Sequence, residues 1–325
     1  MMNKRDTLLS LVHDESVPDY VPAAFFMHFD PAYHRGQAAI DKHLEFFRTT
    51  GMDFVKIQYE KTQPPFGKIR KPVDWTQLPL YPNEFFEEPV RVVKGLVEAV
   101  KSEALVIMTL YSPFMWAAHL DKGGQMGSHF LENPQAVTKG LEIMVENVLK
   151  LVRGCKQAGI DGFYASSQGG EAFRFEDPEI FRKYILPTDL AVWDEIGSCT
   201  FNILHICDYE GTYADLTPFL EYPGDVVNSS LRLVDRTLTT KEVSQMFGRP
   251  FMGGLERKGV IVGGTPEEIR QAATDVLAES PERFILAADC TVPGDTPWEH
   301  LKMAIDTAHQ YRKQWGNIGG AGTIT

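Results

Sequence analysis

The stretch LHICDYEG, residues 204–211, places a histidine and a cysteine two positions apart in a run that otherwise has the character of a buried strand. Side chains two apart on a strand point to the same face, so we expect the His205 imidazole and the Cys207 thiol to lie close together. Imidazole and thiolate are ligands that Zn²⁺ favours. Free cysteine is also among the residues most often buried by simple packing, so the pair alone leaves both interpretations open.

Short apolar runs alternate with longer amphipathic stretches along the whole chain. The eight runs span residues 21–29, 53–59, 104–111, 159–166, 199–207, 224–230, 249–255 and 283–289. The stretches between them carry helix-start signals such as Asn133-Pro134 and Thr265-Pro266. This alternation predicts an α/β fold, a single (β/α)8 TIM-type barrel with an N-terminal helix. An open doubly wound sheet is the alternative, but no G-x-G-x-x-G follows the first run.

The predicted barrel occupies residues 1–315, and the end of the chain, GNIGGAGTIT at 316–325, is expected to be a flexible tail. Residues 60–88, after the second predicted strand, are rich in proline and aromatic side chains. This segment is longer than an ordinary loop between a strand and a helix. We expect it to form a lid or an extra layer over the barrel mouth.

A second cysteine occupies an equivalent place at the end of another predicted strand. Cys290 directly follows the eighth run, and the active sites of such barrels lie at the C-terminal ends of their strands. We therefore predict that His205, Cys207 and Cys290 bind one zinc ion. Three protein ligands and one exchangeable position are typical of a catalytic zinc site. Cys155 in a helical stretch and Cys199 at a strand start are predicted to be packing residues.

Further polar residues close the other predicted strands. Glu60 could act as a general acid/base or as a metal ligand, and a solvated loop carboxylate is its alternative. Tyr111 and Gln168 could hydrogen-bond the reacting substrate; with Glu60 they form the predicted catalytic group. The predicted substrate-binding residues are His28, Asp30, Asn228 and Glu256. Structural roles at the barrel rim remain open for these residues.

Composition and charge exclude several classes of function. The chain of 325 residues is 43% hydrophobic and 23% charged, which is ordinary for a globular protein. Its formal net charge of -12 argues against nucleic acid or an anionic membrane as the main partner. The charged N-terminus does not look like a signal peptide, and no apolar run has the length of a bilayer span. We expect a cytoplasmic protein that acts on a small molecule.

Four stretches resemble the uroporphyrinogen decarboxylase superfamily in order and spacing. They are YSPFMWAAHL (111–120), GIDGFYASSQGG (159–170), LHICDYEG (204–211), and GTPEEIRQAATDVL together with DCTVPGDTPWEHLKMAIDTAH (264–277 and 289–309). The resemblance covers nearly the whole chain and implies a (β/α)8 barrel.

True uroporphyrinogen decarboxylases in this superfamily use no metal and hold the substrate carboxylates with arginines of an F-M-R-Q-A-G-R-Y motif. The corresponding stretch here is FFMHFDPAYHRG (25–36), with His28 at the first arginine position and only Arg35 near the second. Glu60 matches an aspartate that steadies the pyrrole nitrogens in those enzymes. A substrate with eight carboxylates would lose its arginine clamp here.

The other branch of the superfamily contains the methylcobamide-dependent methyltransferases, including coenzyme M enzymes and components of O-demethylases. The coenzyme M enzymes hold zinc with H-x-C and a distant cysteine, and this pattern carries over onto His205, Cys207 and Cys290. A carboxylate near the sixth strand can complete the zinc sphere in that branch, but VVNSSLR (226–232) offers none. Asp208, Glu256 or water could substitute.

The resemblance therefore implies a zinc-dependent, methyltransferase-like enzyme. It would move a methyl group between a methylated corrinoid (a methylcobamide co-substrate, possibly on a separate corrinoid protein) and a thiol or similar acceptor. The alternative is a carboxy-lyase that acts on a tetrapyrrole or a smaller acid.

Overall fold

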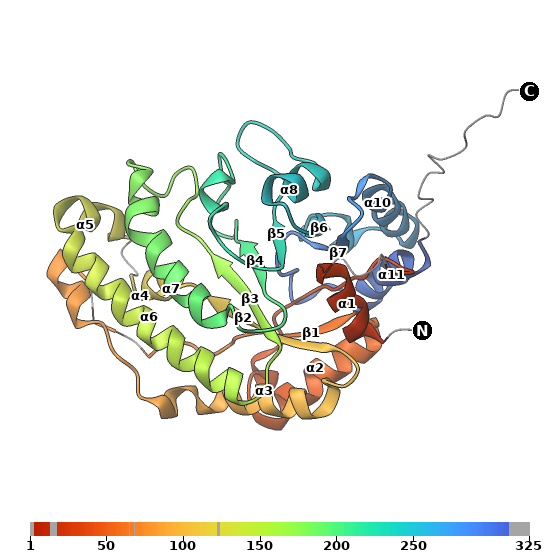
Figure 1. The fold of residues 1–325 in the computed structure, drawn as a ribbon, viewed down its shortest axis with the longest axis horizontal. Coiled ribbons are helices and arrows are strands. Elements are labelled where there is room, and N and C mark those ends of the chain that lie inside the picture. The colour runs from red at the N-terminus through yellow and green to blue at the C-terminus, as the bar shows by residue number, and fades with distance from the viewer. Residues whose placement is uncertain (1–2, 14–17, 65, 68, 122–123, 312–325) are drawn as a thin grey trace, which may run out of the picture.

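The protein is described by a computed structural model that covers residues 3–13, 18–64, 66–67, 69–121 and 124–311. The tail predicted at 316–325, and the predicted domain boundary before it, lie outside the described residues. Within these ranges the chain forms a curled parallel sheet with helices packed around it (Figure 1).

The sheet has seven strands in the described chain, each hydrogen-bonded to the next in sequence order and all parallel. Each strand falls within or beside an expected apolar run, and nearly every strand residue is buried, as expected when both faces of a parallel sheet are covered. The strands are β1 (Phe54–Ile57), β2 (Leu105–Tyr111), β3 (Gly162–Ser167), β4 (Ile203–Ile206), β5 (Val226–Ser229), β6 (Phe251–Leu255) and β7 (Phe284–Ala288).

The eight regular strands predicted from the sequence are not confirmed, because residues 21–29 do not form one. This segment makes two isolated parallel bridges, Ala23 with Leu286 and Met27 with Val292. It also accepts a hydrogen bond from the amide of Asp53, at the start of β1. The segment thus contacts β7 on one side and the start of β1 on the other, an arrangement consistent with a TIM-like barrel. Pro22 has no amide hydrogen to donate, which limits a continuous ladder here.

The helices begin and end near the expected signals. Asn133 caps α6 by accepting a hydrogen bond from the Ala136 amide, and Thr265 forms a capping box with Glu268 on α10. No described helix is both long enough and apolar enough to cross a membrane. The α-helices are α1 (Lys4–His13), α2 (Gly36–Thr50), α3 (Glu87–Val100), α4 (Pro113–Leu120), α5 (Met126–Glu132), α6 (Pro134–Gln157), α7 (Leu186–Ile196), α8 (Thr240–Phe247), α9 (Val260–Gly263), α10 (Pro266–Glu279) and α11 (Trp298–Gln310).

The segment between β1 and α3 is not one irregular loop. It carries two 3₁₀ helices, η2 (Pro72–Gln77) and η3 (Asn83–Phe86), and η2 packs along α6. The fully buried Trp75 anchors it by donating a hydrogen bond of 3.0 Å to His129 of α5. The other short helices are η1 (Pro31–Tyr33), η5 (Thr217–Phe219) and a π-helical turn, η4 (Phe181–Ile185), which leads into α7.

Polar side chains at the strand starts fix the register of the sheet. Each one accepts a hydrogen bond from a backbone amide of the preceding segment, a group that would otherwise be left unpaired at the bottom of the sheet. The pairs are Asp53 with the amide of Ala23 (2.7 Å), Asp161 with that of Val106 (2.8 Å), Asn202 with that of Phe163 (3.1 Å) and Asp225 with that of Asn202 (2.7 Å).

Asp53 joins more segments than the other three. Besides the Ala23 amide, its carboxylate accepts hydrogen bonds from the Tyr20 hydroxyl at 2.7 Å and from His309 Nε2 of α11 at 2.8 Å. The ammonium of Lys4 on α1 lies 3.8 Å away. One buried carboxylate therefore ties the segment before β1 to both terminal helices.

A second buried carboxyl group connects α7 to the sheet. Asp189 is 2% exposed, and its Oδ2 accepts hydrogen bonds from the hydroxyls of Ser167 at 2.6 Å and Tyr222 at 2.8 Å. Burial raises its pKa from 3.8 to about 7, and the hydrogen bonds only partly oppose this shift. The folded protein therefore holds a proton here that the unfolded chain releases.

We predict that Asp189→Asn changes how stability depends on pH. Because the folded-state pKa is raised, the contribution of the protonated carboxyl is complete below about pH 4 and is lost as the pH rises to about 7. Across that window the difference in unfolding free energy between wild type and variant should change by up to ~1.4 kcal/mol per pH unit, in favour of the variant at higher pH. Urea denaturation at several pH values measures this difference in unfolding free energy. If the difference does not change with pH, the raised pKa of Asp189 is contradicted.

Candidate metal centre and active site

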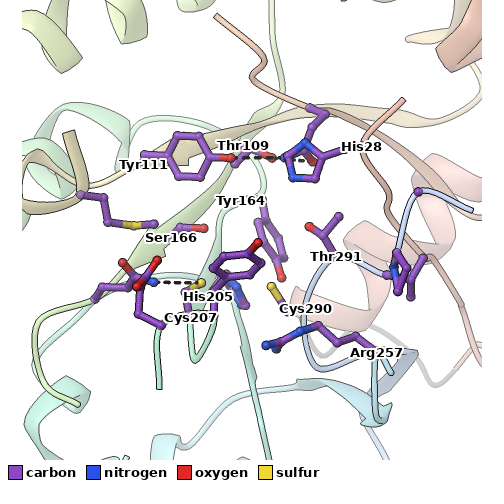
Figure 2. A pocket seen from close by; sticks show the side chains of 18 of the residues that line it. His28, Thr109, Tyr111, Tyr164, Ser166, His205, Cys207, Arg257, Cys290 and Thr291 are labelled. Carbon is purple, nitrogen blue, oxygen red and sulfur yellow. Dashed lines mark hydrogen bonds between the residues drawn. The ribbon is translucent and has the colours of Figure 1, made fainter. Parts of the chain in front are cut away.

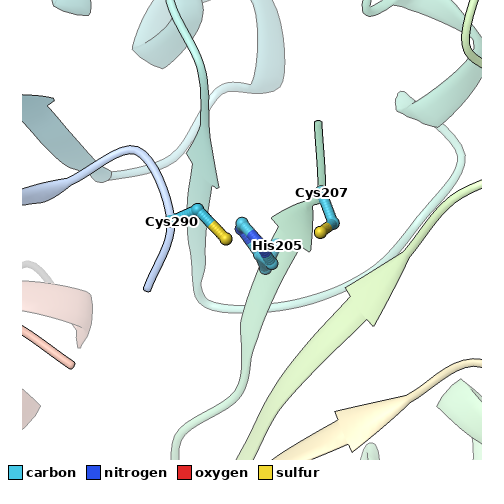
Figure 3. A group of neighbouring side chains, drawn as sticks. All are labelled: His205, Cys207 and Cys290. Carbon is cyan, nitrogen blue, oxygen red and sulfur yellow. The ribbon is translucent and has the colours of Figure 1, made fainter. Parts of the chain in front are cut away.

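His205, Cys207 and Cys290 come together at the C-terminal side of the sheet. His205 lies in β4, Cys207 directly follows that strand, and Cys290 lies two residues beyond the end of β7. Their possible ligand atoms all lie within 4.8 Å of one another, and the residues are 1%, 5% and 7% exposed, respectively. Figure 3 shows the imidazole between the two sulfur atoms. Among the described residues this is the one cluster of three such groups that could hold a metal ion.

The backbone around these residues is firmly placed by neighbouring strands. His205 pairs with Ser166 of β3 and with Asn228 of β5 in the parallel register. The Cys207 amide donates to the carbonyl of Ser167 at 3.0 Å, and the Cys207 carbonyl accepts from the hydroxyl of Tyr213 at 2.9 Å. The cluster therefore does not need an ion to bring its backbone together.

The His205 side chain has the environment expected of a metal ligand. Both of its ring nitrogens are buried and have no hydrogen-bond partner among the described residues. Buried polar atoms without partners are rare and costly, so a ligand for this imidazole is a physical expectation. Its ring stacks on Tyr164 with centroids 4.6 Å apart, and the Tyr164 hydroxyl donates to Asn228. Stacking thus orients the imidazole without using its nitrogens.

The pKa values of the two thiols are shifted in opposite directions, each mainly by the other thiol. The hydrogen bond from the Cys207 thiol lowers the pKa of Cys290, with further help from His205, and it raises the pKa of Cys207 together with burial. Gln168 Nε2 donates a long hydrogen bond of 3.5 Å to Cys207 Sγ. Two adjacent buried sulfurs can both ionise only if a cation lies between them. The donor set and its electrostatics therefore fit zinc.

The cluster forms one wall of a cavity of about 440 Å³. In Figure 2, His28, Thr109 and Tyr111 lie on the side opposite to His205, Cys207 and Cys290, with Tyr164 and Ser166 between the two sides. Six of the ten site residues predicted from the sequence line this cavity: His28, Tyr111, Gln168, His205, Cys207 and Cys290.

The other predicted site residues lie elsewhere. Glu60 lines an adjacent cavity and accepts from His28 Nδ1 at 2.9 Å. Asp30 is exposed and caps η1 by accepting from the Ala32 amide. Asn228 is completely buried and donates to the carbonyls of two neighbouring strands. Glu256 is exposed and lines a third pocket.

Two basic residues were missed as site residues by the sequence reasoning. Lys56 is 5% exposed inside the sheet, and its ammonium lies over the rings of Phe26 at 4.5 Å and Tyr164 at 4.9 Å. Burial lowers its pKa to about 7, against the opposing effects of Cys290, Glu60 and Cys207. The sequence feature that could have indicated Lys56 as a site residue is its position as a lysine in the middle of the apolar run DFVKIQY.

Arg257 is the second missed residue. Its guanidinium lines the cavity and forms an ion pair with Asp208, and its amide donates to Asp289 at 2.8 Å. The Asp208 carboxylate is therefore already paired with Arg257. Neither Asp208 nor Glu256 belongs to the cluster around His205. The fourth zinc ligand suggested from the sequence is not supplied by these two carboxylates in this arrangement.

Residues 48–311 match the family described as Uroporphyrinogen decarboxylase (URO-D), which is well over half of the chain. The chain belongs to the uroporphyrinogen decarboxylase family. The resemblance noted in the sequence is thereby confirmed. No curated protein sequence matches this URO-D family member significantly.

Solved structures show the same fold at low sequence identity. A methyltransferase from Methanosarcina mazei superposes with a TM-score of 0.74 at 14% identity, covering 95% of this URO-D chain and 98% of that one. A B12-independent methionine synthase from Shewanella sp. W3-18-1, in complex with selenomethionine, gives 0.57 at 10% identity, covering 89% and 97%. A putative B12-independent methionine synthase from Listeria monocytogenes gives 0.52 at 16% identity, covering 83% and 84%.

We predict that the two cavity thiols differ in reactivity. In protein treated with a chelator, iodoacetamide should modify Cys290 before Cys207, because the lowered pKa of Cys290 makes it the thiolate. Cys155, buried in α6 with a raised pKa, should stay unmodified and serves as the internal control. Peptide mass spectrometry over time measures each site. Modification of Cys207 first, or equal labelling of Cys155, would contradict this assignment.

Proposed function

We propose that this protein is a zinc-dependent methyltransferase that moves a methyl group between a methylated corrinoid and a thiol or similar acceptor. The observation that carries the proposal is the buried imidazole of His205, which has no hydrogen-bond partner in the described part of the chain and lies beside two thiols in an accessible cavity. A histidine placed only for packing would be expected to hydrogen-bond through at least one nitrogen.

His205, Cys207 and Cys290 are the residues that would hold the ion. Bound zinc lowers the pKa of a coordinated thiol, so that the acceptor is a thiolate nucleophile near neutral pH. Other residues of the chain orient the metal ligands and hold the acceptor. Tyr164 keeps the imidazole oriented by stacking, Gln168 donates to Cys207 Sγ, and the cavity walls hold the acceptor.

The mouth of the cavity suits a corrinoid as the second reactant. Tyr209 lines the cavity and is 69% exposed, which offers a flat apolar surface at the entrance. The Arg257 guanidinium lies over the Tyr209 ring, and its charge is compensated by Asp208; Lys258 also lines the cavity. The structural similarity to the methyltransferase from Methanosarcina mazei supports the reaction class. We propose that the corrinoid arrives on a separate protein.

A carboxy-lyase activity is the second candidate, because the family match carries the name of a decarboxylase. The position of the first arginine of its carboxylate clamp holds His28, which is paired with Glu60. Arg35 is exposed at the start of α2 and does not line the cavity. Among the described lining residues Arg257 is the one arginine, and its charge is neutralised by Asp208. A polyanionic tetrapyrrole is therefore poorly matched.

The metal centre is tested by replacing its ligands. Wild-type protein purified without chelator should contain about one zinc per chain. Cys207→Ser and Cys290→Ser should each lose the zinc and lower methyl transfer from methylcobalamin to a thiol at least ~100-fold, because removing a ligand costs no less than removing its outer partner. Elemental analysis and cobalamin absorbance measure the two effects.

Cys155→Ser is the matched control, since this thiol is equally buried but lies in α6. It should keep both zinc and activity, and circular dichroism should show that all three variants are folded. Negligible zinc in the wild type, or full activity of Cys207→Ser, would refute the proposal.

We also predict that the protein does not convert uroporphyrinogen to coproporphyrinogen. Each unpaired carboxylate in a cavity whose one described arginine is already paired with Asp208 loses a charge-assisted hydrogen bond of about 1.5–3 kcal/mol. Chromatography of porphyrins after incubation under anaerobic conditions measures the product. Turnover at an enzyme-like rate in the presence of a chelator would favour the carboxy-lyase instead.

A further inference from the structure

We propose that Lys56 is a positioning residue that sets the direction of the hydrogen bonds on the cavity wall opposite to the metal ligands, so that Tyr111 offers its hydroxyl proton to the substrate. The far end of the substrate would then carry an uncharged oxygen that accepts this proton. The inference about the substrate rests on the proposed methyl transfer, but the hydrogen-bond directions can be tested without it.

The first link is the contact between Lys56 and Gln58. The Lys56 ammonium is held between the Phe26 and Tyr164 rings and donates to Gln58 Oε1. While Lys56 is protonated, below its pKa of about 7, it has donors and no acceptor, so the amide of Gln58 must turn its oxygen toward it. The Thr109 hydroxyl also donates to this oxygen, at 3.4 Å. The Gln58 NH₂ group is thereby directed to the other side.

The second link fixes what Gln58 contacts with its NH₂ group. Nε2 of Gln58 lies 3.3 Å from His28 Nε2 and 3.4 Å from the Tyr111 hydroxyl oxygen. Both atoms must therefore accept. His28 then carries its proton on Nδ1, and this agrees with Glu60, whose carboxylate oxygens lie 2.9 and 3.1 Å from that nitrogen. Donor and acceptor roles agree at every atom from Lys56 to Glu60.

The backbone of Gln58 is fixed independently. Its amide donates to His43 Nε2 at 3.2 Å, while His43 Nδ1 donates to the Ala39 carbonyl at 2.7 Å. Burial lowers the pKa of His43 to about 4, so this ring stays neutral and keeps its accepting nitrogen. Gln58 can therefore change its amide orientation only by rotating its side chain.

The orientation of the Gln58 amide determines the hydrogen bonding of the Tyr111 hydroxyl. Its oxygen accepts from Gln58, and its proton has no acceptor among the described residues, although the side chain lines the cavity. Burial and the nearby Glu60 raise the pKa of Tyr111, so it remains a donor at neutral pH. An unpaired donor in a cavity discriminates strongly against ligands that cannot accept from it. The charge of Glu60 disfavours a carboxylate or sulfonate at that point.

The hydrogen-bond directions are tested first, by NMR of the ¹⁵N-labelled histidine rings. In the wild type, the His28 signals, assigned by their loss in His28→Gln, should show a protonated Nδ1 and an unprotonated Nε2. In Lys56→Met, Gln58 is free to rotate and the His28 tautomer should shift or become mixed. An Nε2-protonated His28 in the wild type, or an unchanged spectrum in a folded Lys56→Met variant, would overturn the proposal.

The substrate class is tested with two acceptors of nearly equal shape, 2-methoxyethanethiol and 1-butanethiol. The wild type should prefer the ether about tenfold in kcat/KM, the worth of one hydrogen bond of about 1.4 kcal/mol. Lys56→Met, Gln58→Met and Tyr111→Phe should each bring this ratio close to one, mainly through KM for the ether. Tyr184→Phe removes a hydroxyl outside the cavity and should leave the ratio unchanged.

The two measurements separate the two proposals. If the wild type transfers no methyl group, the proposed function fails, and the NMR result still decides the role of Lys56. If the wild type is active but does not distinguish the two thiols, or prefers 3-mercaptopropionate, the inferred substrate class is wrong. Gln58→Met interrupts the same chain of hydrogen bonds with Lys56 in place, so it replaces Lys56→Met if that variant does not fold.

Discussion

The carboxylate of Asp53 is the constraint on which the geometry of the site depends. It binds the Ala23 amide, the Tyr20 hydroxyl and His309 of α11, and so holds the irregular segment 21–29 against the start of β1. The two walls of the cavity come from opposite sides of this junction. His28 lies near the end of the tethered segment, while Cys290 follows β7, to which the same segment is bridged. The tether thus adds to the strand pairing that places Gln58 and Tyr111 relative to Cys207, and it helps to place His28.

The interior of the sheet combines two solutions to the burial of polar groups. On the wall of Lys56 and Gln58, each polar atom finds a protein partner, and the chain of hydrogen bonds leaves one proton for a ligand. On the wall of His205, aromatic stacking and strand pairing hold the residues, and the nitrogens are left without partners. Among the described residues, the first wall presents a single free hydrogen-bond donor, and the second presents the donor set of a candidate metal site.

Much of the fold and of the candidate metal site could be predicted from the sequence, because both follow from short-range periodicity. His205 and Cys207 share a face since their spacing is two in a real strand, and Cys290 is close because parallel strands end on the same side. Asn228 was misplaced because its position inside β5 turns it toward neighbouring carbonyls rather than the cavity. Asp30 precedes Pro31, and its carboxylate is used in capping η1. The role of Lys56 depends on contacts between distant segments, which no local pattern reveals.

The first and last described helices, α1 and α11, both contact Asp53, and this has a consequence for the order in which the chain can be connected. Lys4 of α1 and His309 of α11 reach the same carboxylate, so the first and last described helices share one corner of the molecule (Figure 1). The strand pairs β2–β3, β3–β4 and β4–β5 are each registered by a strand-start contact, which does not depend on the order of synthesis. A circularly permuted gene, with the old ends joined by a short linker and new ends opened in an exposed turn such as the one between β5 and α8, should therefore encode the same cavity.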